Sequence, residues 1–257
     1  MWGTLPSRRH VDYAQPIVQR FDYAVSALSA GGGDSVTIVG SDLGSDLSAL
    51  RVSCTDSRGK THDVHVPPAL SACTYEQPHE RLLCPSVPGA VGSRVTWLVE
   101  VSGLESTSPS TSTHEPCVSS ARVDGQGSTV GGELLVIEGV EFGIDKAAMA
   151  VTYGGIAAQN CNITARNRAI SCLTAPGVGA SLSLSVTVAD QRSSKRRFAT
   201  AGGFVDCVAL DVSYAAPTLE GFAPASSPTA PSGTLVLTVR GTNLGPAEQV
   251  REGKGAA

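Results

Sequence analysis

The sequence has few aromatic and few charged residues, and it has no long apolar run. Of its 257 residues 5% are aromatic and 16% are charged, and the formal net charge is −4. A negative balance with few clustered basic residues argues against nucleic acid as a partner. Because no apolar run approaches the ~18 residues needed to cross a bilayer, membrane attachment is expected only through segments outside this sequence.

Motifs typical of enzymes are also missing from the sequence. It contains no glycine-rich phosphate loop between a strand and a helix, no H-E-x-x-H and no G-x-S-x-G. The run Gly31-Gly32-Gly33 precedes a strand-like segment and is expected to form a turn. We therefore predict a protein that is not an enzyme and that uses no cofactor.

One cluster contains residue types that bind metal ions. Cys54, His62, His65 and Cys73 lie within twenty residues, spaced C-x7-H-x2-H-x7-C. This spacing matches no common structural zinc site, and residues three apart on a strand point to opposite faces. We therefore predict no metal site here and expect the histidines to face solvent in a loop.

The sequence does contain a repeat with the period of a domain. VTIVGSDLG, LVIEGVEFG and LTVRGTNLG share an apolar pair, a glycine, two free positions, Leu or Phe, and a second glycine. The first glycines are Gly40, Gly139 and Gly241, which are 99 and 102 residues apart. Gly40 is expected to adopt a backbone conformation that a side chain would oppose. Units of about a hundred residues are long enough to bury a core of their own.

Other residues repeat in the same register. The units begin at Pro16, Pro116 and Pro217, and each proline is followed sixteen residues later by a glycine. Cys73 and Cys84 are eleven residues apart, as are Cys161 and Cys172, and a Pro-Gly pair follows each second cysteine by four residues. The first unit carries about eleven extra residues around SRGKTHDVHVPP, which are expected to lengthen a loop.

Short alternating strands and polar turns predict an all-β fold of tandem immunoglobulin-like sandwiches. The alternating segments RVTWLVEV and LSLSVTVA each present one face to a core, so Trp97 is expected to be buried. The side chains expected to close one pole of each unit are Leu43, Phe142 and Leu244. The strong Cys-Trp-Cys spacing of antibody domains is missing.

The sequence resembles the IPT/TIG family, immunoglobulin-like (E-set) modules of plexins, transcription factors and many protist and algal surface proteins. The resemblance rests on the P-x-I start, the glycine-rich turn, VTIVGSDLG, the C…C-x-x-x-P-G stretch and the closing aromatic strand. It predicts sandwiches at residues 14–103 and 116–214 and a truncated repeat at 215–257. It implies a fold and says little about activity.

Segments outside these sandwiches are predicted from the same alignment. Tyr13 corresponds to Tyr214, so residues 1–13 are expected to end an upstream repeat, and both termini look cut. Residues 104–115 are rich in Ser, Thr and Pro and lack apolar periodicity. This pattern is typical of a hinge, an O-glycosylated spacer or a plain solvated linker.

The seven cysteines indicate an oxidising compartment, because disulfide bonds inside small β-domains persist only where thiols are not kept reduced. We predict Cys73–Cys84, Cys161–Cys172 and Cys117–Cys207, with Cys54 left over. Buried free thiols in a cytosolic protein are the alternative. For Cys117 and Cys207 the alternatives are Cys54 or another chain.

Two surface features are candidate sites. Asn162 begins the N-x-S/T sequon of this chain, beside Cys161 in a predicted turn, and is a candidate glycosylation site. The run RSSKRR carries Arg192, Lys195, Arg196 and Arg197 and is expected at a hairpin tip. It reads as a solvated turn, as a contact for an anionic partner such as a sulfated glycan, or as a protease-sensitive loop.

These observations predict an extracellular or cell-surface protein of tandem modules that acts as a stalk and binds a protein or glycan ligand. An intracellular module of a transcription-factor-like protein is the first alternative, and the negative charge and paired cysteines count against it. An accessory module of a polysaccharide-acting enzyme is the second. The few aromatic residues give little support to a sugar platform.

Overall fold

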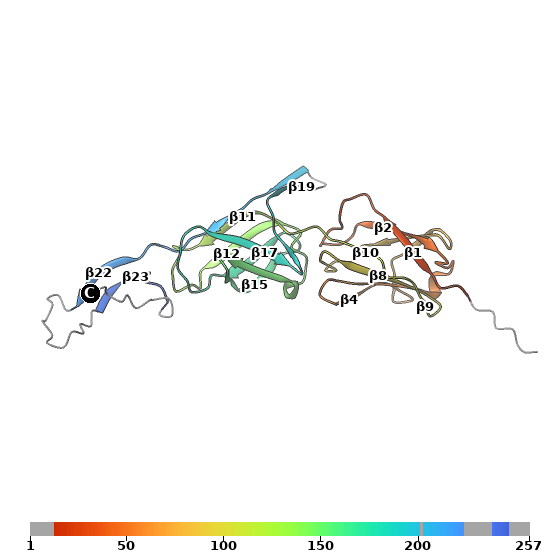
Figure 1. Ribbon diagram of the computed structural model, residues 1–257, viewed down its shortest axis with the longest axis horizontal. Helices are drawn as coiled ribbons and strands as arrows, with labels where there is room; N and C mark the ends of the chain where they lie inside the picture. The colour runs from red at the N-terminus through yellow and green to blue at the C-terminus, as the bar shows by residue number, and fades with distance from the viewer. Residues whose placement is uncertain (1–12, 201–202, 224–237, 247–257) are drawn as a thin grey trace, which may run out of the picture. The chain divides into compact units, whose positions relative to one another are not determined.

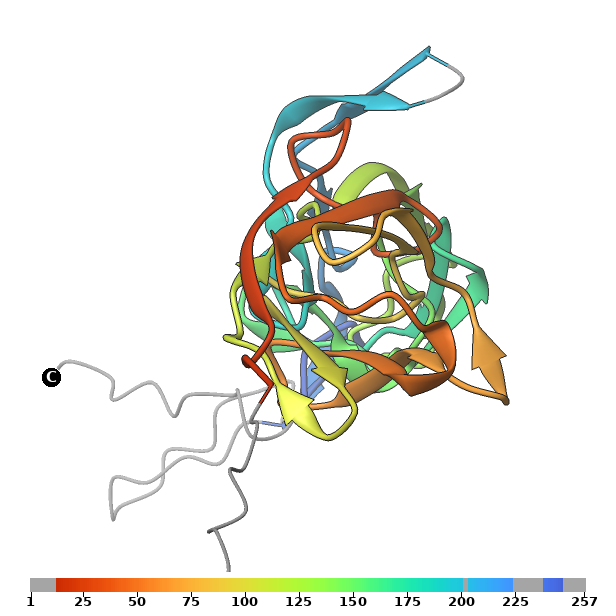
Figure 2. The same cartoon turned by 90° about the vertical axis from the view of Figure 1, so that its right-hand side faces the viewer.

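The computed structural model describes residues 13–200, 203–223 and 238–246. The chain divides into two compact units, residues 1–113 (unit 1) and 114–257 (unit 2), and each is considered by itself. β-strands dominate both units (Figures 1 and 2).

Unit 1 is a sandwich of two antiparallel sheets. Its elements are β1 (Ile17–Asp22), β2 (Ser35–Ser41), the 3₁₀ helix η1 (Leu47–Ala49), β3 (Leu50–Thr55), β4 (Thr61–Val66), β5 (Leu70–Ser71), β6 (Thr74–Gln77), β7 (Arg81–Pro85), β8 (Val95–Val101), β9 (Leu104–Glu105) and β10 (Ser110–Thr111). One sheet has the order β1-β2-β7-β6. The other has the order β10-β8-β3-β4-β5, and β9 also pairs with β8.

Unit 2 repeats this plan and adds two hairpins. Its elements are β11 (Cys117–Asp124), β12 (Leu134–Val140), η2 (Lys146–Ala148), β13 (Met149–Tyr153), β14 (Ile156–Ala157), β15 (Gln159–Ala165), β16 (Ala169–Leu173), β17 (Leu182–Val188), β18 (Gln191–Arg192), β19 (Arg196–Thr200), β20 (Gly203–Cys207), β21 (Asp211–Val212), β22 (Thr218–Ala223) and β23 (Thr238–Thr242). The sandwich sheets are β11-β12-β16-β15 and β14-β13-β17-β18, with β21 also paired to β17. The added hairpins are β19-β20 and β22-β23.

The alternating segments bury one face, as their sequence predicts. In unit 1 Val36, Ile38 and Leu82 of one sheet meet Val52 and Trp97 of the other in a single apolar cluster. Since Trp97 is inside this cluster, its ring is not available as a platform for a sugar. The pole residues Leu43 and Phe142 are also fully buried, whereas Leu244 in the third repeat is partly exposed.

The repeated glycine is required by close approach between strands and not by an unusual backbone angle. A Cβ on Gly40 would lie 2.0 Å from the carbonyl oxygen of Ile17, and one on Gly139 would lie 1.9 Å from that of Cys117. Among the positions with positive φ are the residues two further on, Asp42 and Glu141, and not the glycines themselves. Our expectation of an unusual conformation at Gly40 was therefore wrong.

The predicted linker is part of unit 1. β9 and β10 both pair with β8, and Leu28 forms a parallel bridge to Thr113. The indole Nε1–H of Trp97 donates to the Thr111 hydroxyl at 2.9 Å, and the backbone N–H of Val99 donates to Ser106 Oγ at 3.0 Å. Buried hydroxyls thus replace the apolar side chains of an ordinary strand, and this is why residues 104–113 lack apolar periodicity.

The extra residues of unit 1 form strand β4 and not merely a longer loop. His65 on this strand is fully buried, so the expectation of solvent-facing histidines was wrong. Its Nε2 lies 3.1 Å from the Leu47 carbonyl, and its Nδ1 lies 3.1 Å from the backbone nitrogen of Cys73. The ring therefore accepts from one backbone group and donates to another.

A second inward-facing polar group, Asp56, lies between β3 and β4. The buried carboxylate of Asp56 is 2.7 Å from Arg58 Nη2 and 3.1 Å from His62 Nε2. Burial opposes ionisation of Asp56, but these hydrogen bonds and those from the backbone of Arg58 and Lys60 outweigh it and lower its pKa.

The third repeat contributes the hairpin β22-β23. Leu219 pairs with Gly241 beside a bulge, as Val18 pairs with Gly40 in unit 1. A Cβ on Gly241 would lie 2.0 Å from the Thr218 carbonyl oxygen. Because the third repeat is truncated, the sequence predicts that its apolar segment LVLTV, residues 235–239, has no strand partner. Most of this segment lies outside the described residues, and its last two positions are paired with β22.

Candidate functional site

Unit 2 carries an inserted hairpin that has no counterpart in unit 1. From Val188 to Val212 there are 24 positions, against 10 from Val101 to Thr111 at the same places in the two sandwiches. The 14 additional residues in unit 2 include the ten that form β19 and β20. We call β19-β20 the arm, because it stands out from the sandwich of unit 2 in both ribbon views (Figures 1 and 2).

The base of the arm is fixed covalently to the first strand of the sandwich. The disulfide Cys117–Cys207 joins the start of β11 to the end of β20. Phe198 packs with both cysteines and Val140 in a small apolar cluster. Immediately beyond β20, the backbone N–H of Val208 donates to the carbonyl of Val118 at 2.8 Å. These contacts anchor the arm at one end.

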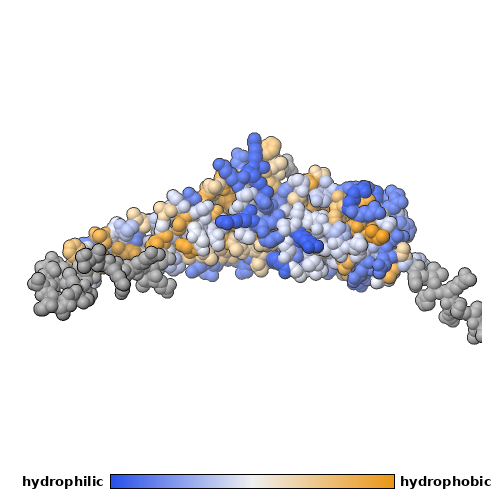
Figure 3. Space-filling model, in the orientation of Figure 1, coloured by the Kyte–Doolittle hydropathy of each residue, from blue (hydrophilic) through white to orange (hydrophobic). Residues whose placement is uncertain are grey.

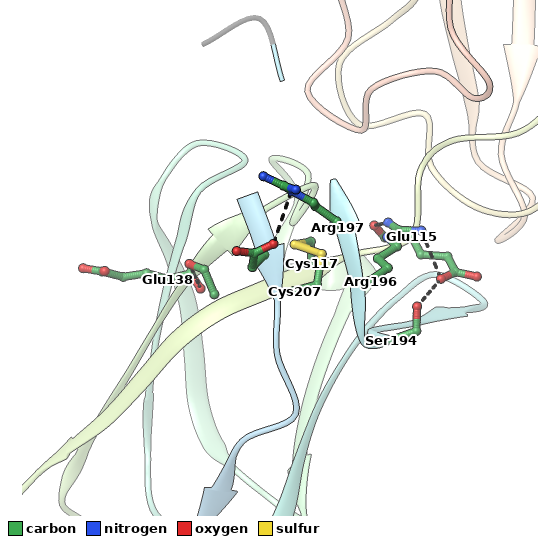
Figure 4. Close-up of a disulfide and its surroundings, with 9 residues drawn as sticks. Glu115, Cys117, Glu138, Ser194, Arg196, Arg197 and Cys207 are labelled. Atoms are coloured by element: carbon green, nitrogen blue, oxygen red, sulfur yellow. Dashed lines mark hydrogen bonds and ion pairs between the residues drawn. A yellow bond between two sulfur atoms is a disulfide. The ribbon is translucent and has the colours of Figure 1, made fainter. Parts of the chain in front are cut away.

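Polar contacts add to this anchor on one side of the disulfide (Figure 4). The carboxylate of Glu115 lies 3.2 Å from Arg196 Nη1 and accepts a hydrogen bond from Ser194 Oγ at 2.7 Å. Arg196 also donates to the backbone carbonyl of Glu115. The ring of Phe198 meets that of His114 edge-on, with centroids 4.8 Å apart. Arg196 is therefore a structural residue of the arm base.

The opposite face of the arm points outward. Arg197 pairs with Asp206 across the hairpin, and Ala199 pairs with Phe204, so these four side chains share one face. The Arg197 guanidinium lies 4.4 Å from the centroid of Phe204 and its Nε lies 3.6 Å from Asp206 Oδ1. Phe204 is 65% exposed. The outward face thus combines an aromatic ring, a cation and an anion.

This combination is typical of side chains that dominate protein interfaces. Arginine and aromatic residues are enriched in interface centres, because a rigid ring offers area at low entropic cost. In the space-filling view, hydrophilic and hydrophobic surface lie next to each other on the arm (Figure 3). The arm presents an exposed arginine and an exposed aromatic ring on a hairpin whose base is attached by a disulfide.

A shallow groove lies beside the arm base, with a volume of about 290 Å³. Its lining includes Ser119 of β11, Glu138 of β12, the exposed Arg168 before β16 and Val205 of β20. The Glu138 carboxylate accepts a hydrogen bond from Ser120 Oγ at 3.1 Å. The groove adds polar side chains of both charges next to the outward face.

The basic run does not lie at a hairpin tip. It leads into the arm: Arg196 and Arg197 begin β19, and the turn of the hairpin follows Thr200. Arg192 Nε donates to Ser185 Oγ at 2.6 Å, while Lys195 is exposed. Arg196 and Arg192 bind groups of their own chain, and Arg197 lies beside Asp206, so the basic run does not form a purely cationic patch.

Phe204 and Asp206 are candidate site residues that sequence reasoning missed. The signal was available: the apolar alternation of RRFAT and GFVDC around Ala-Gly is a hairpin pattern. The basic residues of RSSKRR were interpreted by their charge alone, so the hairpin pattern was not recognised. Cys207 was expected early in the last strand, yet it ends the arm, and the last strand of the sandwich is β21.

The other two disulfides, Cys73–Cys84 and Cys161–Cys172, each join neighbouring strands of one sheet. Asn162 is exposed in β15, which is an edge strand, and not in the predicted turn. Its side-chain oxygen accepts a hydrogen bond from Lys146 Nζ at 3.4 Å, and its Nδ2 donates to the Asn160 carbonyl at 3.4 Å.

Cys54 is the cysteine that the three disulfides leave over, and it is buried against the core of unit 1. Burial, followed by the negative charge of Asp56, raises the pKa of its thiol to about 12. The thiol is therefore unreactive in the folded chain. Cys73 is in a disulfide, and the described residues contain no cluster of His, Cys, Asp or Glu able to hold a metal ion.

Within residues 13–200, 203–223 and 238–246, no helix is long and apolar enough to cross a membrane.

Comparison with known proteins identifies one family. The model of the IPT/TIG domain matches residues 119–199. The match ends inside β19, so most of the arm lies outside it. No curated protein matches the chain.

Two solved structures resemble the chain at 15% sequence identity. One is SGBP-B from a complex xyloglucan utilization locus in Bacteroides uniformis, which covers 70% of this chain with a TM-score of 0.27. The other is described as a crystal structure with xylogluco-oligosaccharide, and it covers 71% with a TM-score of 0.30. This chain spans 48% and 40% of their lengths, and likeness of this degree carries no inference about a ligand.

Strands β11 to β18 form two antiparallel sheets, and the family model matches residues 119–199. Both observations indicate the same sandwich fold for unit 2. This chain therefore contains an IPT/TIG domain, an immunoglobulin-like β-sandwich, within a tandem array of such sandwiches.

Proposed function

We propose that this chain is a non-enzymatic binding and stalk segment of an extracellular or cell-surface protein, and that the arm of unit 2 contacts a protein ligand. The observation that carries the proposal is the exposed stack of Arg197 on Phe204 at the outward face of a hairpin held by Cys117–Cys207. The mechanism is display: the sandwiches supply reach, and the arm supplies the contact.

The disulfides support an oxidising compartment, since such bonds are rare in the cytosol. Cys117–Cys207 closes a loop of 90 residues. Together with the contacts of Arg196 and Phe198 it restrains the base of the hairpin, and a restrained loop loses less entropy on binding. An exposed aromatic ring on a restrained hairpin is therefore a more effective contact than the same ring on a loose loop.

The composition of the outward face favours a protein over a glycan. Asp206 beside Arg197 repels the sulfate or carboxylate groups that a purely basic patch would attract. Phe204, with its ring covered on one side by the guanidinium, suits an apolar pocket whose rim carries polar groups of both charges.

The test is binding of the fluorescently labelled chain to intact cells of the kind that produces it. We expect Phe204→Ser with Arg197→Ser to reduce binding at least tenfold, because both central contacts are removed. The matched control is Val130→Ser, which removes another exposed apolar side chain of unit 2, 78% exposed and outside the arm. This control should leave binding unchanged.

Pretreatment of the cells separates the two ligand classes. Trypsin treatment of the cells should abolish binding if the ligand is a protein, and periodate oxidation of surface sugars should leave it intact. Equal binding of the arm variant and the wild-type chain would overturn the role of the arm. Loss of binding after periodate alone would overturn the protein ligand.

A further inference from the structure

Two equivalent tyrosines have opposite environments. Tyr13 and Tyr214 each begin a Tyr-Ala-x-Pro segment at the entry to a repeat. Tyr214 is 8% exposed, while Tyr13 is 86% exposed. Among the described residues, none surrounds Tyr13 as the sandwich of unit 2 surrounds Tyr214.

Tyr214 is buried by the sandwich of unit 2, which precedes the third repeat in the sequence. Its hydroxyl donates to the carbonyl of Ala175 at 2.6 Å and lies 3.1 Å from the hydroxyl of Tyr153. Its backbone N–H donates to Gly179, and the next N–H, of Ala215, donates to Gly127. The segment is therefore the last edge of the preceding sandwich before it enters the next repeat.

The contact between that sandwich and the following repeat is also present. Gly245 in the third repeat lies against Val178, since a Cβ on this glycine would be 2.7 Å from Val178 Cγ1. Val178 directly follows Pro176-Gly177, the Pro-Gly pair of the repeat. The pole of the third repeat thus meets the Pro-Gly loop of the sandwich before it.

At the same pole of unit 1, the part of the chain that the structure describes supplies no such neighbouring loop. Gly44 is the counterpart of Gly245, since each lies four residues after the repeated glycine. It lines a cavity of about 800 Å³ together with Tyr13, Gln15, Asp46, His79 and Leu104. The cavity therefore lies where the third repeat has a neighbouring loop.

We infer that this cavity is a docking site for an IPT/TIG-type sandwich joined to the chain ahead of Tyr13. Tyr13 closes that sandwich as Tyr214 closes the sandwich of unit 2, and its Pro-Gly loop seats an apolar side chain beside Gly44. The inference rests on the proposed stalk function and adds how consecutive modules meet. A junction seated in this way stiffens the stalk.

The test uses residues 13–257 preceded directly by a second copy of residues 114–213, so that Tyr13 takes the place of Tyr214 in the added sandwich. Hydroxyl-radical footprinting with mass spectrometry reads the two parts of the inference separately. We expect oxidation of Tyr13 to fall about tenfold relative to the unextended chain, and that of His79 and Leu104 to fall at least threefold.

Two variants of the extended chain serve as controls. A flexible Gly-Ser linker inserted after Tyr13 should leave Tyr13 protected and re-expose His79, because closure of the added sandwich survives while docking is lost. Val178→Asp in the added copy should re-expose His79 in the same way.

The recovered disulfides of the added copy establish that it folds. With these present, unchanged oxidation of His79 and Leu104 would overturn the docking site, and unchanged oxidation of Tyr13 would overturn its role in closure. Protection of His79 in the unextended chain that depends on protein concentration would instead assign the cavity to a second copy. None of these outcomes alters binding by the arm, so failure here is distinct from failure of the proposed function.

Discussion

The two units share one frame and differ in where each carries its insertion. In both, the first strand bulges around a glycine of the second, and a 3₁₀ turn capped by an aspartate enters the next strand. In unit 1 the extra residues lengthen β4 relative to its counterpart β14 and bury the ring of His65. Unit 2 inserts the arm, whose polar and aromatic side chains face outward. An insertion that buries its polar groups serves stability, and one that displays them is a candidate for binding.

The inward insertion of unit 1 is constrained by hydrogen bonds. His65 satisfies two backbone groups, and Asp56 is held by Arg58 and His62. Such buried groups are costly if any partner is lost. The outward insertion of unit 2 is held at its base by a disulfide and by the contacts of Arg196 and Phe198, while its outer face is exposed.

The largest effect is expected from removing the arm anchor. Replacing Cys117 and Cys207 by alanine should lower the free energy of unfolding of unit 2 by about 4 kcal/mol, because the bond closes a loop of 90 residues. Hydrogen exchange of peptides from the two units during urea unfolding measures this. Unit 1 should keep its stability, and an equal loss in both units would contradict their independence.

The shared frame is tested at the repeated glycine. Gly40→Ala and Gly139→Ala should each destabilise their own unit by about 3 kcal/mol or more, because the added methyl group collides with a backbone carbonyl. Gly221→Ala is the matched control, since it lies at the bulge of the third repeat and a Cβ there meets nothing within 4 Å. Thermal melts of the variants decide, and a tolerated alanine at Gly139 would refute the steric account.

The inward insertion is tested at its buried ring. His65→Leu should cost unit 1 about 2 kcal/mol, because the backbone N–H of Cys73 and the carbonyl of Leu47 lose their partner. His65→Gln, whose amide can both donate and accept, should recover part of that loss. Urea unfolding followed by Trp97 fluorescence reports on this unit, and equal stability of the two variants would speak against the hydrogen bonds.

A smaller effect tests whether residues 104–113 belong to unit 1. Thr111→Val keeps the shape and removes the acceptor of the Trp97 indole, so we expect a loss of about 1 kcal/mol. Limited proteolysis of the wild-type chain should spare this segment until unit 1 unfolds. Early cleavage there would restore the linker interpretation.

The smallest effect at neutral pH concerns Cys54. Its folded pKa of about 12 lies above its ordinary value of 9.0, so the folded state binds more protons between these values. Its contribution to stability is therefore complete below pH 9 and declines as the pH rises towards 12. Iodoacetamide at pH 8 should label Cys54 only after unfolding, and rapid labelling of the folded chain would contradict its burial.

The sequence was sufficient for the repeat, the sandwich class and the cysteine pairs, because spacing in sequence reflects spacing in a repeated fold. It was insufficient where polar residues are buried. Thr111 and His65 look like solvent-exposed residues until their hydrogen-bond partners are known. The outward face of the arm was missed for a related reason: the contact of Arg197 with Phe204 depends on hairpin pairing, which charge counting does not reveal.

The most direct test of the account is peptide mapping, without reduction, of the protein recovered from the surface of intact cells after blocking free thiols. If the arm is displayed outside the cell, we expect to recover Cys117 joined to Cys207 and Cys161 joined to Cys172. Cys54 should carry the blocking group only after denaturation. Recovery of Cys117 and Cys207 as blocked free thiols, or absence of the protein from the surface fraction, would contradict this account.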